Sequence, residues 1–74
     1  MVDPKEAALA LSVVQGLLGD DPAAERMALE TFDSVEAAAK AYAYLVGYLI
    51  EEVAVARRTP EETVIADLRA RLLG

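Results

Sequence analysis

Hydrophobic residues recur along the chain at helical spacing, and no stretch shows the alternation of period two that is typical of a strand. Proline divides this pattern into segments, because it is favoured in the first turn of a helix and the residue before it avoids the helical conformation. The pattern predicts four helices, at about 4–18, 22–31, 35–57 and 60–73. We therefore expect an all-α fold in which residues 1–74 form a single domain, a compact four-helix bundle.

The segment 35–57 has the longest apolar pattern and is expected to be a long, doubly apolar helix. Ser34 is a suitable N-cap for it, and Glu36 and Lys40 are spaced for an i,i+4 ion pair. At about 100° per residue, one face collects side chains expected to lie in the core: Val35, Ala38, Tyr42, Leu45, Val46, Leu49, Ile50 and Val53. A second apolar strip beside it has heptad-like spacing: Ala37, Ala41, Tyr44, Tyr48 and Val55.

A helix that is apolar around so much of its circumference is usually covered from more than one side. One interpretation is that the three shorter helices cover all of it within a monomer. We favour the other, in which Tyr44 and Tyr48 contact another chain, because tyrosine is enriched at the energetic centres of interfaces. The pattern therefore predicts a homodimer formed through the third helix, either side by side or with this long helix crossing between the two subunits.

The shorter helices are expected to complete the core. The first is predicted to bury Ala7, Ala10, Leu11, Val13, Val14, Leu17 and Leu18, and the last to bury Val64, Ile65, Leu68 and Leu72. The residue before each proline is expected to cap the helix that follows: Asp3, Asp21 and Thr59. Gly19 is expected to end the first helix in the left-handed conformation, and Gly16 is expected where another backbone comes close.

The composition favours association. A chain of 74 residues makes only a marginally stable monomer, and folds of this size usually need disulfides, a metal ion or oligomerisation. The sequence contains no cysteine, so disulfides are excluded, and no histidine, so a structural zinc site is effectively excluded. Oligomerisation is therefore the remaining way to stabilise the fold.

The net charge of −6 argues against binding to nucleic acid or to an anionic membrane surface, since both depend on lysine and arginine. No apolar run reaches the roughly 18 residues of a membrane span, and the first residues do not resemble a signal peptide. We therefore expect a soluble, cytoplasmic protein.

Catalytic chemistry has few candidates here. Without histidine or cysteine, the chain lacks the commonest general base and the best nucleophile, and its glycines do not form a phosphate-binding loop. The acidic cluster Asp20, Asp21 and Glu25 is interpreted as helix capping, and the pair Glu51–Glu52 as a solvated face. We predict no enzyme activity, no cofactor and no metal, and expect a protein–protein interaction or regulatory module with an unidentified protein partner.

Two alternatives remain open. Asp33-Ser34-Val35 resembles the Asp-Ser-Leu motif of acyl carrier proteins, small acidic four-helix domains, and this resemblance implies phosphopantetheine on Ser34. The helix after the serine is acidic on its exposed side in that family, whereas here it is rich in alanine and tyrosine. The other alternative is an acidic inhibitor that mimics nucleic acid, although the carboxylates are scattered along the chain.

The overall layout resembles small all-helical proteins of high-GC actinobacteria and their phages. The shared features are Gly19-Asp20 at the end of the first helix, a short alanine-containing helix, a long apolar helix, and a Thr-Pro-Glu-Glu start to the last helix at 59–62. This resemblance spans the chain and implies no function.

Overall fold

The computed structural model describes residues 4–74, which form four helices: α1 (Pro4–Leu18), α2 (Pro22–Glu30), α3 (Val35–Arg57) and α4 (Glu61–Leu73). No strand occurs in this part of the chain, so the all-α prediction is confirmed. The helix bounds agree with the predicted ones to within a residue at each end. The predicted cap at Asp3 lies outside the described residues.

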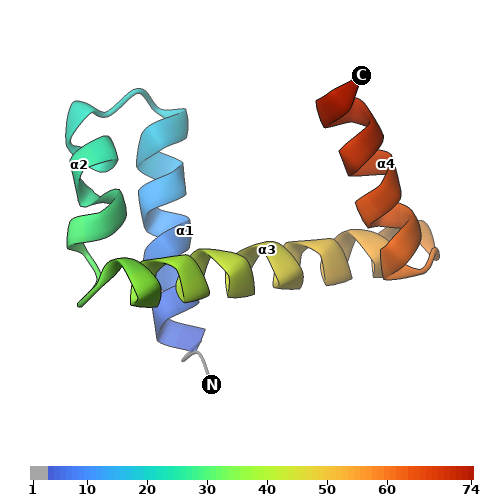
Figure 1. Cartoon of the computed structure of the whole chain (residues 1–74), viewed down its shortest axis with the longest axis horizontal. Helices are drawn as coiled ribbons and strands as arrows, with labels where there is room; N and C mark the ends of the chain where they lie inside the picture. Colours follow the sequence, from blue (N-terminus) through green and yellow to red (C-terminus); the bar gives the residue numbers. More distant parts are fainter. Residues whose placement is uncertain (1–3) are drawn as a thin grey trace.

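The helices form an open, U-shaped arrangement rather than a closed bundle (Figure 1). Helices α1 and α2 lie side by side at one end of α3, and α4 rises from its other end. Within residues 4–74, α4 contacts only α3 and reaches neither α1 nor α2. The radius of gyration is 13.7 Å, whereas a compact domain of this length is expected to have about 11 Å. The single chain therefore lacks the compactness that the sequence pattern predicted.

A glycine allows α1 and α2 to pack closely. A Cβ atom built on Gly16 would lie 2.7 Å from the Cβ of Ala24, closer than real side chains approach, which confirms the close approach predicted for Gly16. The left-handed residue that ends α1 is Asp20, with φ 57°, and not the predicted Gly19. The turn is closed by the backbone N–H of Asp21, which donates to the carbonyl of Gly16 at 3.0 Å.

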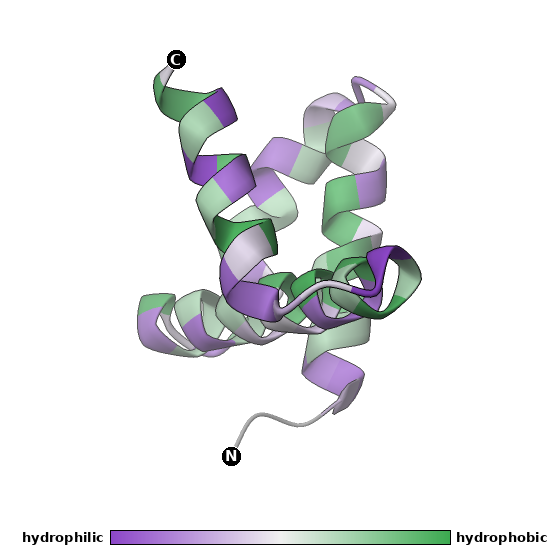
Figure 2. Ribbon diagram, turned by 90° about the vertical axis from the view of Figure 1, so that its right-hand side faces the viewer, coloured by the Kyte–Doolittle hydropathy of each residue, from purple (hydrophilic) through white to green (hydrophobic). Residues whose placement is uncertain are grey.

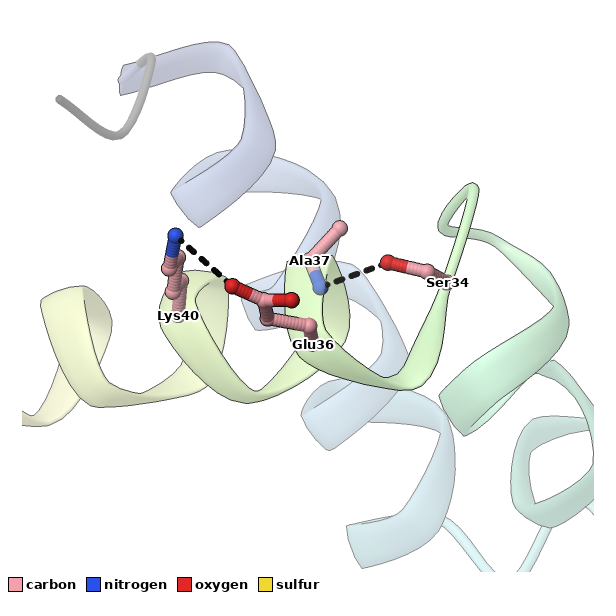
Figure 3. Close-up of polar contacts among 4 residues, drawn as sticks. All are labelled: Ser34, Glu36, Ala37 and Lys40. Carbon is pink, nitrogen blue, oxygen red and sulfur yellow. Dashed lines mark hydrogen bonds and ion pairs between the residues drawn. The ribbon is translucent and has the colours of Figure 1, made fainter.

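The starts of α2 and α3 are capped as predicted. The Asp21 carboxylate accepts a backbone hydrogen bond in the first turn of α2 at 3.0 Å. The Ser34 hydroxyl accepts from the backbone N–H of Ala37 at 3.0 Å, and Glu36 pairs with Lys40 at 3.2 Å (Figure 3). These local contacts explain why α3 begins where it does.

The best-packed part of the molecule lies where α1 and α2 meet the first half of α3. Ala10, Ala41 and Leu45 form its buried centre. Around it, the rings of Phe32 and Tyr42 meet edge to face with centroids 5.7 Å apart. The Tyr42 hydroxyl donates to the carbonyl of Ala28 at 3.0 Å and so ties α3 to the end of α2, and burial raises the pKa of Tyr42.

A left-handed residue also directs α4 away from the axis of α3. Arg58 has φ 55°, and the next N–H, from Thr59, donates to the carbonyl of Ala54 at 3.1 Å. The predicted cap at Thr59 is wrong, because Pro60 occupies the N-cap position of α4 and makes no side-chain capping bond. The Thr59 hydroxyl is instead buried without a hydrogen-bond partner. Helix α4 then buries a single side chain, Val64.

Candidate interaction surface

The predicted core face of α3 is only partly covered, and Ile50 and Val53 on it are half-buried. Ala38, Ala41 and Leu45 are buried beneath α1 and α2. Further along the same face, Val46 is exposed and Leu49 is 46% exposed, and Val35 at the helix start is exposed as well. The prediction that these three lie in the core is therefore wrong for the single chain, because its described residues leave all three side chains exposed.

The predicted contact strip of α3 is mostly open. Tyr48 is 52% exposed, and Tyr44 and Val55 are also exposed. Ala37 is half-buried. Ala41 differs from the rest of the strip: it is fully buried in the core beside Ala10, so it cannot form part of an exposed contact surface.

Two apolar hollows border the exposed apolar surface of α3 around Leu49. The first, called here the tyrosine groove, has a volume of about 330 Å³ and lies between α1 and α3. Its exposed lining residues include Leu11, Tyr44, Tyr48 and Leu49. Leu11 was predicted to lie in the core, and its exposure at this groove corrects that prediction.

The second hollow, called here the apolar notch, lies in the angle between α3 and α4. It consists of two adjoining cavities of about 210 and 470 Å³. Its lining is almost entirely hydrophobic and is defined by Val46, Leu49, Ile50, Ile65, Leu68 and Leu72. Leu49 lines both hollows, so the tyrosine groove and the apolar notch adjoin.

Most of the apolar face of α4 is unburied. The sequence predicted that Val64, Ile65, Leu68 and Leu72 would be buried, but Val64 alone is; Leu72 is 87% exposed. Figure 2 shows hydrophobic residues in the last turn of α4, where Leu72 and Leu73 are both strongly exposed. Leu17 and Leu18 at the end of α1 are likewise exposed, against the predicted burial.

The accessible surface quantifies this exposure. The chain exposes 5854 Å², whereas a compact monomer of 7.9 kDa is expected to expose about 4,400 Å². The excess is therefore about 1,400 Å². Folding of the single chain buries about half of the surface of the unfolded chain, below the roughly 60% typical of a domain of about 60 residues.

Charged side chains lie near the two hollows. Glu52 lies on α3 next to Leu49 in the helical projection, between the notch side and the tyrosine side. Arg69 on α4 borders the notch. Both are exposed, and neither makes an ion pair within residues 4–74.

The other candidate sites from the sequence are Ser34, a metal site and an acidic surface. Ser34 is exposed, and its hydroxyl serves as the acceptor that caps α3. Across residues 4–74, no three potential metal-binding side chains are grouped together. Acidic residues occur in the first turns of all four helices and do not collect on one of them.

Comparison of the chain with protein-family models, with curated proteins and with solved structures found no match. The resemblances noted in the sequence therefore stay predictions. None of the helices between residues 4 and 74 combines the length and the apolar character needed to cross a membrane.

Proposed function

We propose that this protein is a non-enzymatic interaction module that forms a homodimer through α3. The observation that carries the proposal is the exposed apolar surface of α3 around Leu49, where the tyrosine groove and the apolar notch adjoin. Hydrophobic patches of this extent on a small soluble domain are typical of protein contact surfaces.

The area of this surface suits a subunit contact. A standard interface buries about 800 Å² on each partner. The excess exposure of the single chain, about 1,400 Å², is large enough to supply that area. A partner would also bring the buried fraction of the chain closer to that of independently stable domains.

The residue types favour contact over catalysis. Tyr44 and Tyr48 present large, partly apolar rings at the groove, and such rings contribute strongly to binding when a partner encloses them. The sequence has neither histidine nor cysteine to act as a base or a nucleophile. We therefore assign the surface a binding role. We also propose that the protein is cytoplasmic and that the dimer binds a further protein as a regulatory module.

The proposal is tested by Tyr48→Arg, with Ala43→Arg as the matched control. Both add an arginine to an exposed position of α3, but Ala43 lines neither hollow. Sedimentation velocity is expected to show dimers for the wild type and for Ala43→Arg, and monomers for Tyr48→Arg. Circular dichroism checks that all three proteins are folded. A monomeric wild type, or a Tyr48→Arg variant as dimeric as the control, would overturn the proposal.

A further inference from the structure

We infer that the apolar notch of each chain holds α4 of a second copy, so that the last helices of two chains dock reciprocally beside each other, an arrangement called here the exchange of α4. This inference rests on the proposed self-association and names the segment that performs it. The compact helical bundle predicted from the sequence would then be completed by two chains together, and not by one.

The spacing along α3 leaves room for one additional helix. The contact with α1 includes Ala41, which is buried beside Ala10, and the turn to α4 begins at Ala54, whose carbonyl accepts from the Thr59 N–H. The 13 residues between these positions span about 20 Å of helix axis. Packed helices lie about 8–10 Å apart, so about two such spacings fill this length. A single helix therefore fits between α1 and α4.

Helix α4 is the segment of a second copy that is free to enter this space. Helices α1 and α2 are held by their mutual contact and by their contact with α3, through buried residues such as Ala10 and Ala24. Helix α4 buries only Val64 and contacts only α3 among the described residues. Its residues Leu68 and Leu72 line the notch of their own chain and are exposed there, so α4 of a second copy docked in the notch would cover them.

Reciprocal exchange satisfies both surfaces at once. A two-fold interface is self-complementary. When α4 of the first copy enters the notch of the second, α4 of the second copy therefore enters the notch of the first. Arg69, which borders the notch of its own chain, and Glu52, beside Leu49 on α3, are opposite in sign, so two copies docked in this way bring charges of both signs to the contact.

A substitution at the end of α4 tests this inference directly. Leu72→Glu is chosen because Leu72 is 87% exposed in the single chain, so the fold should tolerate the change. Ala70→Glu is the control, since Ala70 is exposed on α4 and does not line the notch. Sedimentation equilibrium is expected to show a dimer dissociation constant at least about 100-fold higher for Leu72→Glu, because each dimer loses two buried leucines. The control is expected to dimerise like the wild type.

The outcomes separate this inference from the proposed function. If Leu72→Glu dimerises as the wild type does while Tyr48→Arg is monomeric, the chains self-associate by another route and the exchange of α4 is wrong. If the wild type itself is monomeric, both proposals fail.

Chemical cross-linking gives a second, positive test. The sequence contains no cysteine, so a chain with Leu49→Cys and another with Leu72→Cys each carry one reactive thiol. After mixing, exchange of α4 places the Leu72 position of one chain in the notch that Leu49 of the other chain lines. A short bis-maleimide is then expected to join the two chains in much higher yield than it joins Ala43→Cys to Leu72→Cys. Equal yields would overturn the inference.

Discussion

The contact between α1 and α2 can be tested by giving two glycines the same change. Gly16 and Gly47 both lie inside helices, where alanine is favoured over glycine by about 1 kcal/mol. Their surroundings differ completely. A Cβ atom on Gly47 would meet nothing within 4 Å, whereas one on Gly16 would lie 2.7 Å from the Cβ of Ala24. Gly16→Ala and Gly47→Ala therefore separate helix propensity from packing.

The expected effects follow from these surroundings. Gly47→Ala should gain the full propensity term, about 1 kcal/mol. Gly16→Ala gains the same term but inserts a methyl group against Ala24, which is only 3% exposed and belongs to another helix. Overpacking of this kind costs about 1–3 kcal/mol. The free energies of unfolding of the two variants should thus differ by about 1–3 kcal/mol, with Gly47→Ala the more stable.

Thermal unfolding followed by circular dichroism measures this difference. For a domain of this size, 1 kcal/mol shifts Tm by about 4–8 °C. Gly47→Ala is expected to melt above the wild type, and Gly16→Ala several degrees below Gly47→Ala. All proteins are compared at one concentration, with their oligomeric state checked by sedimentation, because association also changes Tm. If the two alanine variants melted together, the close packing of α1 on α2 at Gly16 would be refuted.

Two further predictions concern the ends of α2 and α3. Arg58→Gly should stabilise the protein by about 1 kcal/mol, because Arg58 has φ 55° and glycine adopts this conformation without steric cost. Arg57→Gly should destabilise the protein, because Arg57 is the last residue within α3. If urea unfolding ranked the stabilities of the two variants in the opposite order, the turn geometry would be contradicted. Tyr42→Phe should cost about 1 kcal/mol at neutral pH through loss of the hydrogen bond to Ala28. Because burial raises the pKa of Tyr42 above its ordinary value, the folded state binds this proton more tightly than the unfolded state, so wild-type stability should be lost as pH rises above about 10. Urea unfolding at several alkaline pH values should show a smaller loss for Tyr42→Phe, and parallel losses would show that Tyr42 is not the titrating group.

The helix starts could be predicted from the sequence because they depend on local chemistry. Asp21 and Ser34 each accept a backbone hydrogen bond within three residues, so neighbouring residues suffice to identify them as caps. Thr59 stands before a proline in the same way, yet it does not cap α4. The turn at Arg58 carries the backbone through a left-handed residue and encloses the Thr59 hydroxyl, and the local pattern contains no signal for that turn.

Burial along α3 could be predicted only in part, for a different reason. Periodicity shows which side chains share a face of the helix, but not how far along that face another helix extends. Leu45 and Leu49 lie on the same predicted face, yet Leu45 is buried and Leu49 is half-exposed. The difference arises because α1 and α2 cover the start of α3 and α4 turns away at its end, an arrangement set by tertiary contacts.

The account depends on the claim that a second chain covers the exposed apolar surface of α3 around Leu49. Sedimentation equilibrium of the unmodified protein over a wide concentration range tests this claim most directly. We predict a mass approaching twice the 7.9 kDa of the chain as concentration rises. A mass that stayed at 7.9 kDa throughout the range would contradict it.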